Sequence, residues 1–270
     1  MPKIKEIFKS MDISISLFLN LPFYQFGKKI WASKERYLNL FETERIAIYP
    51  EIDILEKEIG YSINKDWLDN LALHTQVVIK KSKINYQHGR ILYSYLRKYL
   101  YNNNNVAILE TGTSRGFSSL CMAKAINDSK KEGKIFTIDI IPNDLPMIWN
   151  CIDDHEKKKT RVELLNPWRH LLTYISFLHG KSRKVLDNLK LERVNFAFLD
   201  AMHKWRDLEM EFQYVEKRQV KNDLIIFDDV TKGQFDEVVK YIKYISSLNK
   251  YSVQYLQSNS ERGYAICTRL

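Results

Sequence analysis

The chain has 270 residues, of which 45% are hydrophobic and 13% aromatic, and its formal net charge is +9. This length and apolar content exclude a disordered protein and predict one large globular domain, or one domain with a sizeable extension. The charge does not by itself indicate a nucleic acid or an anionic membrane as partner, because the basic residues form short separate runs.

The three cysteines indicate the redox environment. Cys121, Cys151 and Cys267 are scattered and have no paired metal-ligand spacing. Such a set is typical of buried free thiols in a reducing compartment, and it argues against a disulfide framework. We therefore expect a cytoplasmic protein.

The first third of the chain has helical spacing without a strand rhythm. Residues 13–23 (ISISLFLNLPF) imitate a signal peptide, but Asn20 and Pro22 interrupt the run and no small-residue cleavage pattern follows. We expect a helix that packs on the protein or touches a membrane surface, and no segment is long and apolar enough to cross a bilayer. With Pro50 and Gly60 as breaks, the pattern predicts a helical N-terminal extension or cap over residues 1–84.

Residues 85–270 alternate between helices and strands. A helix with one apolar face is predicted just before the polar run at 102–105, and the connection at 142–173 is long enough for a helical insertion near the ligand. Strands are predicted at 106–110, 134–139, 174–179, 195–200 and 223–228, followed by a terminal antiparallel pair at 251–257 and 263–269. Nearly continuous apolar strands joined through helices predict an α/β fold with a parallel sheet covered on both faces.

A loop with two glycines follows the first predicted strand. Glu110 ends the strand, and Gly112 and Gly116 follow it. A dinucleotide-binding loop needs a middle glycine where the backbone approaches the pyrophosphate, and Ser114 stands there instead, which argues against a nicotinamide or flavin enzyme. Asp139 ends the next strand, where a carboxylate can accept hydrogen bonds from both hydroxyls of a ribose. The pattern indicates a ligand with a zwitterionic tail and one nucleoside; a tight turn without a ligand is the alternative.

At these positions, residues 85–270 resemble the class I S-adenosylmethionine-dependent methyltransferases. The resemblance implies a Rossmann-like sheet of seven mostly parallel strands with an antiparallel last strand. It implies that the glycine loop holds the methionine end of the cofactor, that Asp139 binds the ribose, and that the segment HGKS at 179–182 lies beside the adenine. The cofactor-binding residues expected in this way are Glu110, Gly112, Thr113, Ser114, Gly116, Ser118, Asp139, Gly180 and Ser182.

Carboxylates end two further strands. Asp200 follows one strand, and Asp228 and Asp229 follow the next. Because the carboxyl ends of parallel strands share one edge of a sheet, these groups can converge beside the cofactor. Converging carboxylates repel one another, and Mg²⁺ relieves this repulsion by binding their oxygens. In the alternative interpretation, Asp229 only caps the following helix and His203 is a structural residue.

This D-x-x-H sequence followed by an acidic pair is similar to the macrocin-type enzymes, which are metal-dependent O-methyltransferases acting on sugars of natural products. The resemblance implies that Asp200, Asp228 and Asp229 bind Mg²⁺ and that His203 is the base. Two positions depart from the subgroup, since Ala201 stands where glycine is frequent and Asp228 where glutamate is common. The shorter side chain of Asp228 can loosen the ligand geometry.

The function expected from the sequence is an S-adenosylmethionine-dependent O-methyltransferase, assisted by Mg²⁺, with a glycosyl or other small-molecule acceptor. An RNA methyltransferase and a nucleoside-binding domain without catalysis are the alternatives. The RNA alternative is favoured only by the charge, and no RNA-binding module supports it, so we do not expect a nucleic acid as partner. Contact with a membrane surface and a homo-oligomer remain open.

Overall fold

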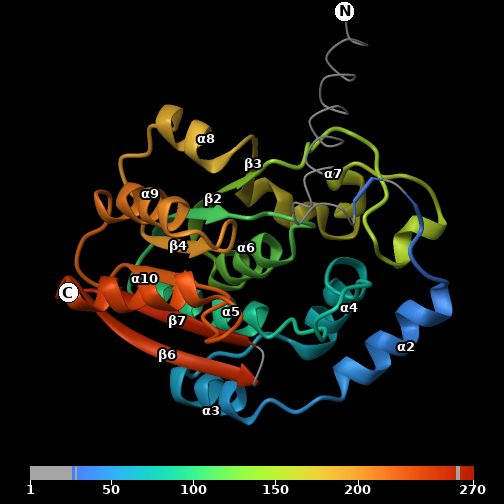
Figure 1. Ribbon diagram of the computed structural model, residues 1–270, viewed down its shortest axis with the longest axis horizontal. Coiled ribbons are helices and arrows are strands. Elements are labelled where there is room, and N and C mark those ends of the chain that lie inside the picture. Colours follow the sequence, from blue (N-terminus) through green and yellow to red (C-terminus); the bar gives the residue numbers. More distant parts are fainter. Residues whose placement is uncertain (1–25, 28, 260–261) are drawn as a thin grey trace, which may run out of the picture.

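The computed structural model describes residues 26–27, 29–259 and 262–270, and the helix expected at 13–23 lies outside these residues. A seven-stranded sheet with the order β3-β2-β1-β4-β5-β7-β6 forms the centre of the molecule (Figure 1). Its strands are β1 (Asn105–Thr111), β2 (Glu132–Asp139), β3 (Ile175–His179), β4 (Phe196–Leu199), β5 (Leu224–Phe227), β6 (Tyr251–Asn259) and β7 (Arg262–Arg269).

The strand directions confirm the predicted fold class. Strands β1 to β5 pair in parallel, whereas β7 runs antiparallel to β5 and β6 pairs antiparallel with β7. The sheet is therefore Rossmann-like and mostly parallel, with an antiparallel last strand. The carboxyl ends of β1 to β5 lie at one edge, which is where the sequence places the acidic residues and the glycine loop.

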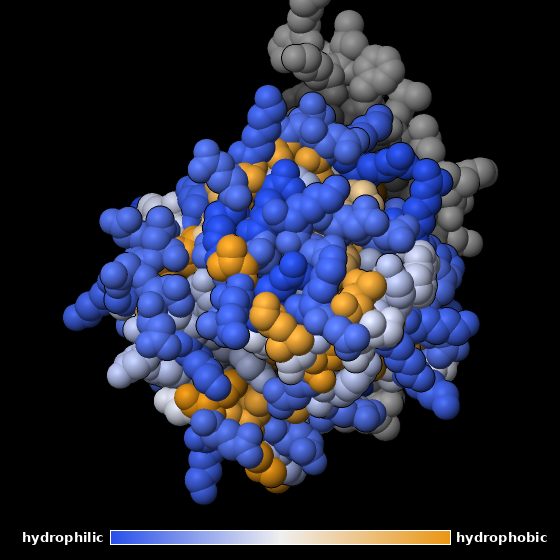
Figure 2. Space-filling model, turned by 90° about the vertical axis from the view of Figure 1, so that its left-hand side faces the viewer, coloured by the Kyte–Doolittle hydropathy of each residue, from blue (hydrophilic) through white to orange (hydrophobic). Residues whose placement is uncertain are grey.

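Helices cover both faces of this sheet. The buried residues of one face pack with α2 (Lys34–Arg45), α3 (Pro50–Ile59), α4 (Lys65–Thr75), α5 (His88–Tyr101) and α6 (Phe117–Ser129). Those of the other face pack with α8 (Ser182–Asn188), α9 (Trp205–Glu216) and α10 (Asp236–Ser247). No helix in the described part of the chain is both long and apolar enough to span a bilayer. The face shown in Figure 2 is mostly hydrophilic, with separate hydrophobic patches.

The N-terminal helices begin and end where the sequence provides capping residues. The Asn64 side chain accepts a hydrogen bond from the Trp67 N–H at 2.9 Å and caps α4. Pro50 is the first residue of α3, and Gly60 ends this helix with a φ of 83°. The two breaks expected from the sequence are thus real helix boundaries.

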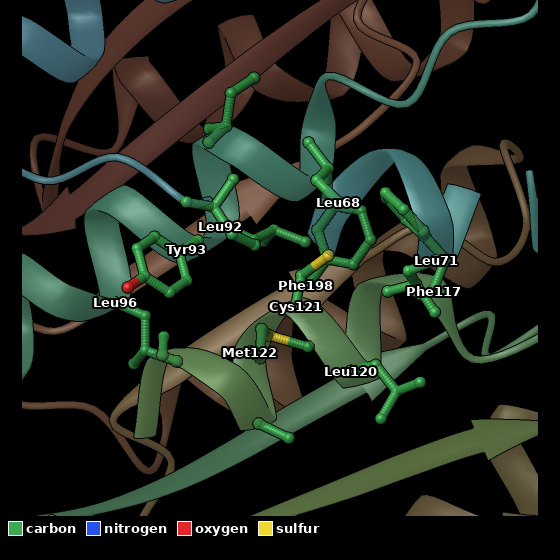
Figure 3. Packing of buried hydrophobic residues seen from close by; sticks show 14 of the residues in the cluster. Leu68, Leu71, Leu92, Tyr93, Leu96, Phe117, Leu120, Cys121, Met122 and Phe198 are labelled. Carbon is green, nitrogen blue, oxygen red and sulfur yellow. The ribbon is translucent and has the colours of Figure 1, made fainter. Parts of the chain in front are cut away.

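The N-terminal helices share one hydrophobic core with the sheet. Figure 3 shows side chains from α4, α5, α6 and β4 in a single cluster, among them Leu68, Leu92, Phe117 and Phe198. Each of these four side chains is at most 2% exposed. The division into residues 1–84 and 85–270 remains a prediction from the sequence pattern, and the cap is packed as part of the same core.

The long connection between β2 and β3 contains three short helical segments, as expected for an insertion. They are η1 (Ile152–His155), α7 (Arg161–Leu164) and η2 (Asn166–Tyr174). A small separate cluster that includes Phe26 and Trp149 anchors this connection. The three cysteines are buried free thiols, as predicted.

Candidate active site

The loop after β1 is held by a buried carboxylate. Glu110 has no exposed surface, and its two oxygens accept hydrogen bonds from the hydroxyls of Ser118 and Ser119 at the start of α6. Burial raises the pKa of Glu110, and the two serine hydroxyls oppose this shift. Glu110 and Ser118 were both expected to bind the cofactor. They are instead hydrogen-bonded to each other, and this bond ties the end of β1 to the start of α6.

The two glycines of this loop are required by the protein's own packing. Gly112 has a φ of +93°, and a Cβ atom there would lie 2.0 Å from the backbone oxygen of Asp200. Gly116 has a φ of +89°, and its Cβ would lie 2.7 Å from a methyl group of Leu165. We expected a Cβ at either glycine to fill the ligand's space or to strain the turn. The positive φ values agree with the second reason, whereas the space beside the glycines is filled by backbone at Gly112 and by a flexible side chain at Gly116 rather than by a ligand.

Asp139 connects the glycine loop to the end of β2. Its carboxylate accepts hydrogen bonds from the N–H groups of Ser114 at 2.5 Å and Ile141 at 2.8 Å. Burial raises the pKa of Asp139, and the nearby Arg161 guanidinium counteracts this shift. A carboxylate has about four acceptor positions, so these bonds leave acceptor capacity for a ribose. The neighbouring Thr113 hydroxyl is bonded to Thr137 at 2.6 Å.

Arg161, which was not predicted, packs against both the glycine loop and Asp139. Its side chain is 1% exposed, and its Nε donates to the Ser114 carbonyl oxygen at 2.9 Å. Its Nη2 lies 3.8 Å from Asp139, and the guanidinium stacks over the ring of Trp149 at 5.6 Å. The residue belongs to the β2–β3 connection and stands in a polar sequence, so no pattern distinguished it from a surface arginine.

The segment after β3, which the resemblance places beside the adenine, lies against Asp139. The N–H of Gly180 donates to the backbone oxygen of Asp139 at 2.8 Å, and Gly180 has a φ of +144°. Ser182 begins α8 two residues later. The predicted cofactor residues thus gather around the carboxyl ends of β1, β2 and β3.

The buried carboxyl group of Glu211 on α9 contacts the end of β1 and the segment after β3. Glu211 has no exposed surface, and its Oε2 accepts a hydrogen bond from the Thr111 hydroxyl at 2.8 Å. Burial raises the pKa of Glu211 to about 7, and the hydroxyls of Ser182 and Thr111 oppose the rise. Sequence reasoning missed this residue, because one glutamate on an amphipathic helix is indistinguishable from a solvent-exposed one.

Asp200, His203 and Asp229 come together at the ends of β4 and β5. Each residue offers one potential ligand atom, and these atoms lie within 4.8 Å of one another. The Nε2 of His203 is 3.1 Å from Asp229 Oδ2 and 3.8 Å from Asp200 Oδ1. Asp229 adopts a φ of +57°, a strained value that is frequent at functional sites. It does not cap the next helix, since α10 begins at Asp236 with Phe235 as its N-cap.

Asp228, the third predicted metal ligand, is directed to a different partner. Both of its oxygens accept hydrogen bonds from Arg262, one of them from Nε at 3.1 Å. Asp228 is 2% exposed and also accepts the N–H of Asp229 at 2.7 Å. The expected trio of carboxylates is therefore replaced by two carboxylates and the imidazole of His203. Arg262 was not singled out from the sequence.

The charges of this group favour a cation between the carboxylates. Burial and the charge of Asp228 raise the pKa of Asp200. Burial also acts to raise the pKa of Asp229, but the hydrogen bond to His203 and the nearby positive charges together lower it. Burial opposes the charged form of His203, but its bonds to Asp200 and Asp229 raise its pKa to about 10. In the metal-free protein, the positive charge of the protonated His203 ring therefore neutralises the same carboxylate oxygens that a bound metal ion would neutralise. Two carboxylates fit Mg²⁺ or Mn²⁺, and the imidazole nitrogen suits a transition metal.

Residues 109–230 match the family described as "Methyltransferase domain". This segment, which runs from the end of β1 to the loop after β5, is similar to a methyltransferase domain. The expectation that it is an S-adenosylmethionine-dependent methyltransferase is confirmed by this match together with the fold. No match was found among curated proteins.

Several solved structures share the fold at low sequence identity. Cofactor-bound Rv0187 from MTB is 14% identical with a TM-score of 0.58, and the similarity covers 83% of this chain and 98% of that chain. TomG from Streptomyces achromogenes, an O-methyltransferase of tomaymycin synthesis in complex with SAM, is 15% identical with a TM-score of 0.53, covering 77% and 91%. An O-methyltransferase from Bacillus cereus in complex with SAH is 17% identical with a TM-score of 0.51, covering 83% and 93%.

Proposed function

We propose that the protein transfers the methyl group of S-adenosylmethionine to a hydroxyl group of a glycosyl or other small-molecule acceptor, with a divalent cation beside the acceptor. One observation carries this proposal: the glycine loop at 112–116, which suits the methionine end of the cofactor, contacts the end of β4 that bears Asp200 of the acidic cluster (Asp200, His203 and Asp229). The position of a Cβ at Gly112 is 2.0 Å from the Asp200 oxygen, and the Asp200 N–H donates to the Thr111 oxygen at 3.0 Å. A cofactor on the loop and an acceptor at Asp200 would therefore be neighbours.

Different residues of the site contact different parts of the cofactor. Asp139 accepts hydrogen bonds from the ribose, and the segment at Gly180 and Ser182 lies beside the adenine. The backbone of the loop at 112–116 faces the methionine end. Because methyl transfer needs an in-line approach of the nucleophile, much of the rate gain comes from this positioning.

Asp200, His203 and Asp229 activate the acceptor hydroxyl in this proposal. Asp200 and Asp229 would hold the divalent cation, which when bound lowers the pKa of a coordinated hydroxyl. His203 takes the hydroxyl proton, and for this it must first lose the proton that the two carboxylates stabilise in the metal-free protein. Asp229, 3.1 Å from Nε2, orients the ring.

Labelled S-adenosylmethionine tests this function directly. The protein is incubated with the labelled compound and with fractions of an extract of its source cell, with and without a chelator. We expect transfer of label to a small hydroxylated compound and loss of transfer with the chelator. Calorimetric titration with S-adenosylhomocysteine is the companion measurement. No binding would refute the cofactor site, and binding without transfer to any fraction would favour a nucleoside-binding domain without catalysis. Cytoplasmic location and a small-molecule partner remain proposals from the sequence.

A further inference from the structure

Two buried arginines join the glycine loop at 112–116 to the long connection between β2 and β3. Arg161, on the connection, donates from Nε to the backbone oxygen of Ser114 at 2.9 Å. In the opposite direction, Arg115 of the loop donates from Nε to the backbone oxygen of Trp149 on the connection at 2.5 Å. Arg161 is 1% exposed and Arg115 is 5% exposed. The loop and the connection are therefore held together by a reciprocal pair of bonds to backbone oxygens.

The guanidinium of Arg161 also reaches the end of β2. Its Nη2 donates to the backbone oxygen of Ile141 at 3.3 Å and lies 3.8 Å from the Asp139 carboxylate. Its Nη1 donates to the side-chain oxygen of Asn143. Asp139 in turn accepts the N–H groups of Ser114 and Ile141. Arg161 thus contacts the same two backbone segments that Asp139 joins.

The charge of Arg161 affects the carboxylate beside it. Burial raises the pKa of Asp139, and the Arg161 guanidinium lowers it again, which favours the ionised form that accepts hydrogen bonds from hydroxyls. A buried charge is unfavourable unless it is paired and hydrogen-bonded, and the planar fork of an arginine meets this need with several donors at fixed angles. Because replacing such a charge by an apolar side chain is often neutral for stability, we expect its effect mainly in the geometry of the site.

The connection that carries Arg161 is itself attached to the N-terminal extension. The Asn150 side chain donates from Nδ2 to the backbone oxygen of Ile79 at 2.9 Å, and its Oδ1 accepts the Ile79 N–H at 3.1 Å. The Nδ1 of His74 on α4 lies 2.5 Å from the Asp153 carboxylate in η1. These contacts fix the backbone from which the arginine extends.

We propose that Arg161 is a positioning residue for the cofactor, which locks the glycine loop to the end of β2 and thereby holds Asp139 in place for the ribose. This inference rests on the ribose role of Asp139 in the proposed function. Arg161 acts through Ser114 and Asp139 and needs no contact with the cofactor itself. The cofactor site thus extends to the connection between β2 and β3 and, through Asn150, to the N-terminal extension.

The test uses Arg161→Met, with Arg169→Met as the matched control because Arg169 is an exposed arginine of the same connection. The affinity for S-adenosylhomocysteine is measured by calorimetric titration. We expect Arg161→Met to weaken binding about five-fold, as for the loss of one hydrogen bond to the cofactor, and Arg169→Met to leave it unchanged. In an Asp139→Ala background, Arg161→Met should have no further effect, because residues that act through one another are not additive.

The pH dependence of the same affinity is a second readout, which a simple loss of packing would not change. Removing the arginine charge raises the pKa of Asp139 further, so Arg161→Met should lose affinity at a higher pH than the parent does. Arg161→Lys keeps the charge without the fork of donors, so it should restore the pH dependence but not the full affinity. Glu110 on β1 and His179 on β3, which flank Asp139, are the same in all these proteins.

Each outcome decides between the proposal and its alternatives. Equal affinity of Arg161→Met and the parent, additive losses in the double variant, or an unchanged pH dependence would overturn the positioning role. A parent protein that does not bind S-adenosylhomocysteine would refute the cofactor site of the proposed function instead, and an Asp139→Ala variant that binds as tightly as the parent would refute its ribose role. Thermal unfolding checks that the variants are folded, and Arg161→Lys replaces Arg161→Met in the comparison if the latter is not.

Discussion

Replacing Glu211 by glutamine is expected to stabilise the protein above pH 7. The pKa of Glu211 is raised from 4.5 to about 7 in the folded state, so between these values the folded protein keeps a proton that the unfolded chain releases. Stability linked to this group is therefore present below pH 4.5 and is lost as the pH rises to 7. The side chain is fully buried, and at about 1.4 kcal/mol per pH unit the loss amounts to about 3 kcal/mol.

Glutamine has the same shape and carries no titrating proton, so it should accept the Thr111 hydroxyl without this loss. Urea denaturation at pH 5 and pH 8 measures the effect as the difference between variant and parent. We expect Glu211→Gln to gain up to about 3 kcal/mol on the parent from pH 5 to pH 8. Glu209→Gln, at a partly exposed position of the same helix, is the control and should show no such gain. A variant that loses stability equally at both pH values would refute the view that Glu211 is a neutral anchor.

Three further predictions concern the loop and the acidic group. Asp139→Ala should weaken S-adenosylhomocysteine binding several-fold in calorimetry while the protein still folds, because it removes two acceptors from the ribose; unchanged affinity would contradict the ribose site. Gly112→Ala should lower the free energy of unfolding by at least about 2 kcal/mol, and by more than Gly116→Ala does. The reason is that the backbone of Asp200 cannot move aside, whereas the side chain of Leu165 can. Equal denaturant midpoints of the two variants would disprove this. Asp200→Asn should abolish Mn²⁺ binding in an electron paramagnetic resonance titration. His203→Ala should retain Mn²⁺ binding and slow methyl transfer by a factor of about 10²–10⁴. Loss of Mn²⁺ binding in both variants would make His203 a ligand rather than a base.

The positions of the acidic residues were predictable because the sheet topology determines them. Once parallel strands are recognised, the residue that ends each strand must lie at one edge, and this placed Asp139, Asp200 and Asp229 correctly. Their partners were not predictable in the same way. Arg262 reaches Asp228 from a strand 34 residues further along the chain, and no local period encodes that contact.

The predicted role of the glycines shows a second limit of the sequence. The pattern indicated a loop with Gly112 and Gly116 after the first strand, and both residues do adopt the positive φ that few other residues tolerate. It could not show whether a ligand or the protein itself fills the space beside them. That depends on the depth at which the loop lies against the end of β4, which is a property of the tertiary packing.

The shared core of the cap and the sheet has a consequence for engineering. One way to vary the protein is to exchange the segment before α5 with that of a related enzyme. Leu68 and Leu71 of α4, however, pack into the same cluster as Leu92 and Phe117. A chimera joined at residue 84 would therefore place foreign side chains against an unchanged surface of α5 and α6. The segment and the sheet therefore depend on each other for folding, and both sides of the junction have to be exchanged to keep the core packed.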